Sequence, residues 1–221
     1  MWALMRYVDM NTDIVDMKPE LETEVHPFGA WVPDGAKVLI MGTFPPQPKR
    51  WSMEFFYPNR TNDFWYAMGM LFYGDRKALL RPGSRDFDLD KIKALLDREG
   101  IALSDTGYRI RRLAGNASDK FLEIVEPVDL DSLLRRMPQC RAIATTGQKA
   151  AEVLAGLTGT DAPAMGHYME CSPRPLGDGR ETLPLEIWRM PSTSRAYPLP
   201  LAKKAEYYGA LFKSVGIRVV N

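Results

Sequence analysis

Aromatic side chains are interleaved with basic ones between residues 49 and 60, in the loop that follows a short apolar run at residues 38–41. Aromatic rings can stack on a nucleic-acid base and cations can hold its phosphates, so this mixture favours a nucleic-acid site over a metabolite pocket. The same composition arises when the rings belong to the core and the cations to a solvated surface, and both interpretations remain open. The side chains concerned are Lys49, Arg50, Trp51, Phe55, Phe56, Tyr57 and Arg60.

A predicted strand and a predicted helix frame this stretch. Residues 38–41 form an uninterrupted apolar run, which is typical of a buried strand. Pro45-Pro46 then prevents the chain from continuing as a β-strand or a helix, because proline has no N–H to donate. An apolar helix is expected from Asn62 to the residue before Gly74. Loop side chains therefore follow the carboxyl end of a strand, where open α/β sheets bind ligands.

Two further loops are expected to leave predicted strands at the same edge. One joins a strand at residues 141–145 to a helix that begins at Gln148, and the other follows a strand at residues 185–190. Between Ile187 and Ala205 there are four basic residues and no acidic residue. Lys149, at the start of a helix, could reach a phosphate, although a solvated lysine is the commoner situation.

Predicted strands and helices alternate along the chain, which favours a parallel sheet with helices on both faces. Polar, basic connections are expected at residues 75–87 and 104–112, and a short strand at residues 121–125. Residues 1–36, interrupted by three prolines, are expected to form an irregular N-terminal arm on one domain of residues 37–221. Helices are predicted at residues 62–73, 88–99, 129–137, 148–157 and 202–215.

The composition narrows the class of protein. The 221 residues carry 29 basic and 28 acidic side chains, so contact with nucleic acid must depend on a local patch. Cys140 and Cys171 fit a reducing compartment, and no apolar run approaches membrane-spanning length. We therefore expect a cytoplasmic monomer without membrane contact. The two histidines lack partners at metal-ligand spacing, and no dinucleotide-binding or P-loop motif is present, so neither metal nor cofactor is expected.

Three longer motifs and two shorter ones follow one another between residues 37 and 215. The longer ones are Gly42-Thr43-Phe44-Pro45-Pro46, Tyr57-Pro58-Asn59-Arg60-Thr61-Asn62-Asp63-Phe64-Trp65 and Met190-Pro191-Ser192-Thr193-Ser194-Arg195; the shorter ones span residues 100–105 and 146–150. In this order they resemble the uracil-DNA glycosylase superfamily, nearest its hypoxanthine-DNA glycosylase and mismatch-specific uracil-DNA glycosylase branch.

The resemblance implies a three-layer α/β/α sandwich around a four-stranded, mostly parallel sheet. It further implies a monofunctional DNA glycosylase of base-excision repair that hydrolyses the N-glycosidic bond of a flipped-out deaminated base, uracil or hypoxanthine. The partner would be DNA that contains the damaged base. Two alternatives are a non-catalytic nucleic-acid-binding relative with the same fold and a nucleotide- or small-molecule-processing α/β enzyme.

The resemblance also assigns residues to the base and to the water. Many superfamily members carry Asp or Asn at the third position of the first motif, where Phe44 stands here and cannot orient water. The resemblance therefore implies that Asn62 orients the water, although Asn62 could equally be a helix cap. Asp63 is the nearest carboxylate, although a role in the helix dipole is the simpler explanation. The base-binding residues it implies are Gly42, Thr43, Phe44, Pro45 and Tyr57, of which Phe44 and Tyr57 could instead be core residues.

The last motif corresponds to a loop that members of the superfamily press into the duplex. Its hydroxyl and backbone N–H groups could bind phosphates, although a Ser/Pro turn beside a sheet would look the same. The expected DNA-binding residues are Lys49, Arg60, Lys149, Pro191, Ser192, Thr193, Ser194 and Arg195.

Overall fold

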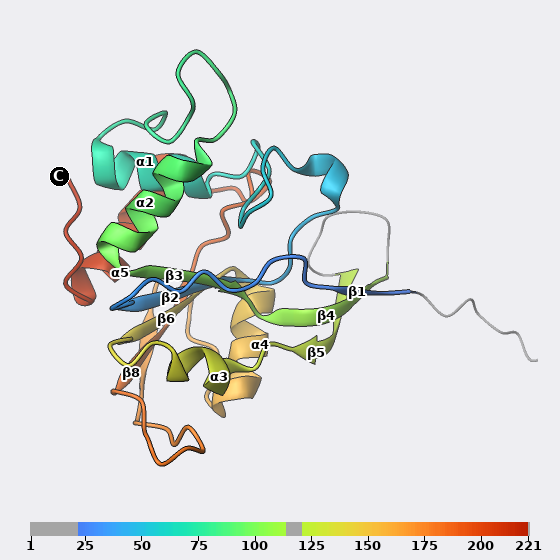
Figure 1. Ribbon diagram of the computed structural model, residues 1–221, viewed down its shortest axis with the longest axis vertical. Coiled ribbons are helices and arrows are strands. Elements are labelled where there is room, and N and C mark those ends of the chain that lie inside the picture. Colours follow the sequence, from blue (N-terminus) through green and yellow to red (C-terminus); the bar gives the residue numbers. More distant parts are fainter. Residues whose placement is uncertain (1–21, 114–120, 221) are drawn as a thin grey trace, which may run out of the picture.

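The computed structural model describes residues 22–113 and 121–220, and its central layer is a sheet of five strands (Figure 1). In spatial order these are β3 (Ile101–Asp105), β2 (Val38–Gly42), β6 (Ala142–Thr146), β8 (Leu185–Met190) and β7 (Tyr168–Cys171). The first four are parallel, and β7 pairs antiparallel with β8. Four strands were expected, and the fifth is the edge strand β7, which belongs to the connection between α4 (Gln148–Thr158) and β8.

Helices cover both faces of the sheet, as the alternation of elements predicted (Figure 1). One layer contains α1 (Phe64–Tyr73), α2 (Leu89–Glu99) and α5 (Leu201–Ser214), and the other contains α3 (Leu130–Arg135) and α4 (Gln148–Thr158). Every residue of β2 is buried because alternate side chains enter opposite layers: Val38 and Ile40 join the first, Leu39 and Met41 the second. The fold is therefore an α/β/α sandwich.

The helix ends follow the expected local rules. Asp88 caps α2 by accepting a hydrogen bond from the backbone N–H of Lys91 at 3.1 Å, and Asp129 caps α3 by accepting from Ser132 N at 2.9 Å. Gly100 ends α2 in the left-handed region at φ +71°, which costs glycine little because it has no Cβ. No helix within the described ranges has the length and apolar character needed to cross a membrane.

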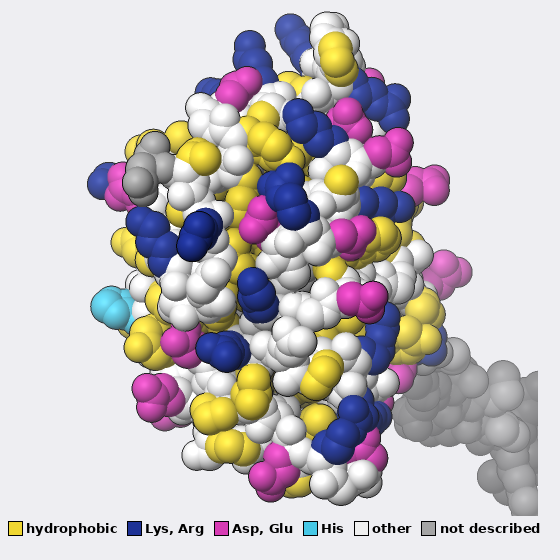
Figure 2. All heavy atoms as spheres, turned by 60° about the vertical axis from the view of Figure 1, so that its left-hand side comes forward, with side chains coloured by type: hydrophobic (Ala, Val, Ile, Leu, Met, Phe, Trp, Pro, Cys, Tyr) yellow, Lys and Arg dark blue, Asp and Glu magenta, His cyan; other side chains and the backbone are white. Residues whose placement is uncertain are grey.

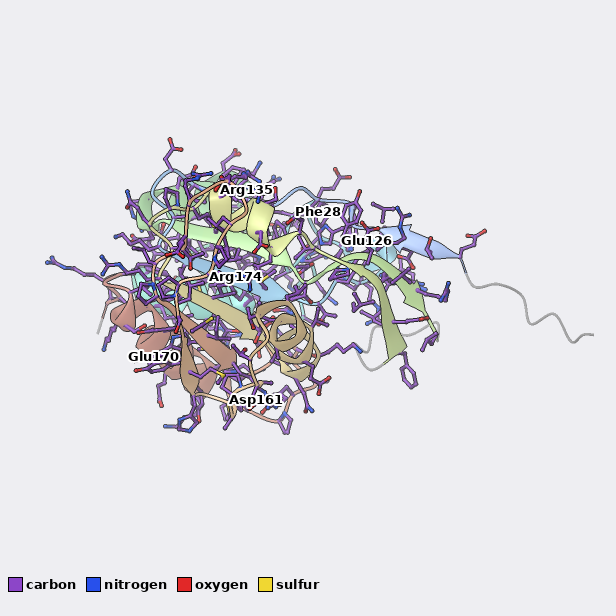
Figure 3. The ribbon with its side chains drawn as sticks, turned by 90° about the horizontal axis from the view of Figure 1, so that it is seen from below. Phe28, Glu126, Arg135, Asp161, Glu170 and Arg174 are labelled. Carbon is purple, nitrogen blue, oxygen red and sulfur yellow. The ribbon has the colours of Figure 1, made fainter. Side chains whose placement is uncertain are left out.

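A second, smaller sheet lies beside the main one and was not expected. It consists of β1 (Thr23–Val25), β4 (Gly107–Arg112) and β5 (Leu122–Pro127), all antiparallel. The prediction of a basic loop around Arg109–Arg112 was wrong, because each arginine meets a glutamate on a neighbouring strand. Arg111 pairs with Glu123 at 2.8 Å and Arg112 with Glu24 at 2.7 Å. Figure 3 places Glu126, the partner of Arg109, on this sheet.

The arm that precedes β2 is also less irregular than expected. Within its described part, β1 pairs with β4, and Trp31 exchanges backbone hydrogen bonds with Leu103 at 2.9 Å in both directions. Residues 1–21 lie outside the described residues. The division into an arm of residues 1–36 and a domain of residues 37–221 remains a prediction.

The long connection between α4 and β8 is held by two arginines. Arg174 donates to the carbonyl of Leu157 at 3.0 Å and pairs with Asp131 at 2.9 Å, and Arg135 donates to Leu176 O at 2.7 Å (Figure 3). These bonds tie the connection to α3 and α4.

Candidate functional site

A cavity of about 290 Å³ lies at the carboxyl edge of the main sheet. The register aligns the strand ends there, because Gly42 pairs with Asp105 and Thr146 pairs with Met190. The loops after β2 and β8 complete the walls. Most residues selected from the sequence line this cavity: Gly42, Thr43, Phe44, Pro45, Tyr57, Asn62, Ser192, Thr193, Ser194 and Arg195.

Tyr57 occupies a strained position in the cavity wall. Its φ of 51° is in the left-handed region, which non-glycine residues seldom adopt and which is concentrated at functional sites. Its ring stacks on Phe64 with 3.9 Å between centroids, and its hydroxyl lies 3.3 Å from Thr146 Oγ1. Tyr57 is therefore both packed and at the cavity, with one ring face already covered.

Phe44 joins the first loop to the small sheet. It is 8% exposed and packs with Ile110 and Leu122, while the guanidinium of Arg112 lies 5.6 Å from its ring centre. Arg112 also donates to the carbonyl of Pro45 at 2.9 Å. Phe44 thus has the contacts of a core residue and still contributes to the cavity lining.

Asn62 bonds to the start of α1 from the rim of the cavity. Its Oδ1 accepts from the backbone N–H of Phe64 at 2.8 Å, and its backbone forms an isolated bridge with Ser194. The bond to Phe64 fixes the orientation of the amide. Nδ2 can then donate to a ligand, and Oδ1 keeps a second lone pair that can accept from one. The N-cap residue itself is Asp63, so Asn62 bonds to the first turn from one residue before the cap and also lines the cavity.

Asp63 is engaged in a buried ion pair. Its Oδ2 accepts from Lys204 Nζ at 2.9 Å, and Arg195 Nε approaches Oδ1 at 3.4 Å. Lys204 is fully buried and also donates to the carbonyl of Ser194 at 2.8 Å. A carboxylate held in this way is a poor general base, so this potential role of Asp63 is disfavoured. The pair instead fixes the loop after β8 against α1 and α5.

The loop after β8 is a serine-rich turn that packs on α1. Ser192 Oγ accepts from Ser194 N at 3.2 Å, and the carbonyl of Thr193 accepts from Asp63 N at 2.8 Å. The carbonyl of Pro191, which is buried, accepts from the hydroxyl of Tyr208 at 3.3 Å. The Ser/Pro turn expected as an alternative is therefore present, and it places Ser192 and Ser194 at the cavity.

Three predicted DNA-binding cations do not line the cavity. Lys49 and Arg60 line a neighbouring groove instead, and Arg60 Nε donates to Asp86 Oδ1 at 2.8 Å. Lys149 is half-buried in the first turn of α4. Their proposed role thus does not include contact with a base in the cavity.

Sequence reasoning missed the pair formed by Asp105 and His26. Asp105, at the end of β3, is the one carboxylate in the cavity lining, and its Oδ2 lies 2.8 Å from His26 Nε2. The two side chains are only 8% and 7% exposed. His26 Nδ1 lies 2.7 Å from the carbonyl oxygen of Phe28 and 3.1 Å from its backbone N–H, so both ring nitrogens of His26 have polar partners.

Gly42 leaves the space that the Asp105 carboxylate occupies. A Cβ at Gly42 would lie 2.5 Å from Asp105 Oδ1 and 3.6 Å from the hydroxyl of Tyr57. The carboxylate and the phenol therefore converge on the same point beside β2. The only available signal was that Asp105 ends a predicted motif, whereas His26 is 79 residues distant and had been considered only as a metal ligand.

No protein-family model matches the chain, and no curated protein matches it. Among solved structures, an NMR structure from Methanosarcina acetivorans, of a protein provisionally named as a uracil DNA glycosylase, is similar. The TM-score is 0.58 and the identity 20%, over 88% of this chain and 99% of the other. At this identity the likeness shows the fold alone: the chain has the α/β/α fold of that protein.

Proposed function

We propose that the protein is a DNA glycosylase that hydrolyses the N-glycosidic bond of a deaminated base in base-excision repair. The observation that carries the proposal is the convergence of Tyr57, Asn62 and Asp105 on one cavity of about 290 Å³, which Arg195 also lines. The name given to the structural neighbour supports the same activity. A base within a duplex is inaccessible, so the target nucleotide enters the cavity by flipping.

Asp105 and Tyr57 hold the inner edge of the flipped base. The sugar remains attached to the DNA backbone and stays at the mouth of the cavity, so the base edge farthest from the sugar meets the most recessed groups. A carboxylate accepts hydrogen bonds and cannot donate them when ionised. Uracil and hypoxanthine present a ring N–H on that edge, whereas cytosine and adenine present an unprotonated ring nitrogen. Asp105 therefore favours the deaminated bases over their parents.

Asn62 positions the attacking water at the rim. As the glycosidic bond breaks, its electron pair leaves with the base, positive charge develops on the sugar, and the water oxygen bonds to C1′. The base leaves as an anion and takes up one proton, while the water gives up one proton and keeps the other in the new C1′ hydroxyl. An amide does not titrate usefully, so Asn62 acts by orientation and by its dipole. Phe44 contributes a wall without a polar group.

Hydrolysis is favoured over a lyase reaction that requires a lysine nucleophile. Lys204 is close to the loop after β8, but it is fully buried and paired with Asp63 at 2.9 Å. Its amine is engaged by Asp63 and by the carbonyl of Ser194, so it cannot reach C1′ of the sugar. Water held at Asn62 is the nucleophile in the proposal.

A non-catalytic DNA-binding relative is the second candidate. Two observations favour it: Phe44 replaces a polar residue in the first loop, and Asn62 Oδ1 already accepts a backbone hydrogen bond. Both leave fewer groups to orient water than a glycosylase site commonly has.

An alkali-cleavage assay separates these functions. The purified protein is incubated with a labelled oligonucleotide that contains one uracil or one hypoxanthine, and the products are treated with alkali. Cleavage at the modified position is expected, because base removal leaves an alkali-labile abasic site. A shifted band without cleavage would overturn the catalytic proposal in favour of the binding protein. The absence of both cleavage and a band shift would favour a metabolite enzyme.

A further inference from the structure

A second, larger hollow adjoins the cavity. Its volume is about 660 Å³, and it shares Arg50, Asn59, Thr61 and Arg195 with the cavity lining. Its walls come from three separate segments: the loop after β2, the connection between α1 and α2, and the loop after β8. We call it the basic groove, because its lining has no acidic residue and includes Lys49, Arg50, Arg60, Arg76, Lys77, Arg85 and Arg195.

Most of these cations have no counter-charge. Only Arg60 and Arg195 form ion pairs, with Asp86 and Asp63 respectively; the other five cations form none with any residue the structure describes. The arginines of β4, in contrast, each pair with a glutamate. Gathering like charges without partners raises the local positive potential and costs repulsion, which a bound polyanion relieves.

The walls of the basic groove are fixed by specific contacts. The connection between α1 and α2 folds back on itself, since Leu80 and Phe87 form a bridge and Arg81 N donates to Asp86 O at 2.9 Å. The ion pair of Arg60 with Asp86 then fastens this connection to the loop after β2. The groove is thus built by contacts between segments that are distant in sequence.

Tyr66 of α1 arranges two of the cations. The guanidinium carbon of Arg76 lies 5.4 Å from its ring centre and that of Arg195 lies 5.7 Å from it. Cation–π contacts of this kind orient a guanidinium without neutralising it. In Figure 2, Lys and Arg side chains project at the upper end of the molecule, the end at which Figure 1 draws the connection between α1 and α2.

We propose that the basic groove binds the phosphates of the DNA strand that carries the target nucleotide, on one side of that nucleotide. The inference rests on the proposed function, because it takes the cavity to hold a flipped base. The next phosphates of that strand must leave the cavity across its rim, and Arg50, Asn59 and Arg195 of the rim are also groove residues. Exposed cations recognise the backbone and not the base sequence.

The test compares two matched double variants. Arg76→Gln with Arg85→Gln removes two unpaired cations from the groove, neither of which lines the cavity. Lys37→Gln with Arg141→Gln removes two cations beside the amino ends of β2 and β6, at the opposite edge of the sheet, and serves as the control. Dissociation constants for an oligonucleotide with a central uracil are measured by fluorescence anisotropy at several salt concentrations, and thermal melting confirms that both variants are folded.

We expect the groove variant alone to bind more weakly and with less salt dependence. Each lost phosphate contact reduces the steepness of the negative slope of log K against log salt by about 0.7–0.9, so the loss of two contacts reduces it by about 1.5. Shortening the oligonucleotide from one side of the uracil should weaken wild-type binding and leave the groove variant nearly unaffected. Equal slopes for the wild type and the groove variant, or equal sensitivity to shortening from either side, would overturn the inference.

Base release in the same samples separates this inference from the proposed function. With saturating DNA, the groove variant should release base at the wild-type rate, because its substitutions lie outside the cavity. If the wild type shows the salt dependence but releases no base, the proposed glycosylase activity is refuted and the proposed binding of phosphates by the basic groove is retained. If the wild type releases base but its slope of log K against log salt equals that of the groove variant, only the proposed role of the basic groove is refuted.

Discussion

Replacement of Gly42 by alanine tests whether the Asp105 carboxylate belongs to the working site. The new Cβ would lie 2.5 Å from Asp105 Oδ1, so the carboxylate must move by about 1 Å to restore ordinary contact. A movement of that size breaks or bends its bond of 2.8 Å to His26. Misplacement of a positioned group by about 1 Å can reduce the rate by about 100-fold, and we expect a loss of that order.

The cost in stability should be much smaller than the loss of activity. Overpacking destabilises by about 1–3 kcal/mol, and replacing a glycine within a strand recovers about 0.5–1 kcal/mol. The net loss is a fraction of the stability of a typical domain, so the variant remains folded. Reduced activity can therefore be assigned to the cavity.

The assay is single-turnover base release together with thermal melting, and Gly156→Ala is the control. Gly156 lies in α4, and a Cβ there meets no atom within 4 Å, so that variant should keep its activity and melt no lower than the wild type. The ¹⁵N NMR signal of His26 Nε2 reports the bond to Asp105 independently of catalysis. A folded Gly42→Ala variant with wild-type release and an unchanged His26 signal would refute the reasoning.

Three further substitutions or probes test other parts of the structure. Tyr57→Ala should weaken productive DNA binding by roughly 1–3 kcal/mol if its ring stacks on the base; an unchanged KM would assign it to packing alone. Lys204→Met should reduce the free energy of unfolding in urea by about 3 kcal/mol, because it leaves the buried carboxylate of Asp63 with only its longer contact to Arg195 at 3.4 Å; a loss below about 1 kcal/mol would contradict a structural role of the buried pair. Burial raises the pKa of the Cys140 thiol from 9.0 to about 12, so a thiol reagent at pH 8 should label the half-buried Cys171 first and Cys140 only on unfolding. Rapid native labelling of Cys140 would contradict its burial. Because the raised pKa keeps Cys140 neutral in the folded state, its contribution to stability should be complete below pH 9 and fall as the pH rises toward 12.

The elements with strong local signals could be predicted from the sequence. The apolar run of β2 and the caps at Asp88 and Asp129 gave the strand and both helix starts correctly. The helix after the first loop begins at Phe64, two residues later than expected, because the side chain of Asn62 bonds to the first turn from outside the helix.

Of the small sheet, only β5 (Leu122–Pro127) had a usable local signal, and it overlaps the strand predicted at residues 121–125. In β4 the alternation of Tyr108, Arg109, Ile110 and Arg111 is short and holds one buried apolar side chain, Ile110, and the partner strand β1 lies far away in the sequence. Arg112 and Glu24, for example, are separated by 88 residues. Cross-strand charge pairs stabilise such a strand only after the sheet has formed. The local sequence pattern alone therefore indicates a loop.

The electrostatic organisation of the site was also beyond sequence reasoning. Asp63 and Lys204 are separated by 141 residues, and Asp105 and His26 by 79. Each pair depends on which elements the fold places next to one another, whereas the cavity itself follows from the alignment of strand ends, which the order of elements indicated.

The most direct test of the central claim is single-turnover release of free base, quantified by mass spectrometry, with DNA binding measured in the same samples. Duplexes that contain uracil or hypoxanthine are compared for the wild type and Asn62→Ala. We expect the wild type to release at least one base and the variant none, with similar dissociation constants for the two proteins. Tight binding by the wild type without release of any base would contradict the claim that this cavity cleaves N-glycosidic bonds.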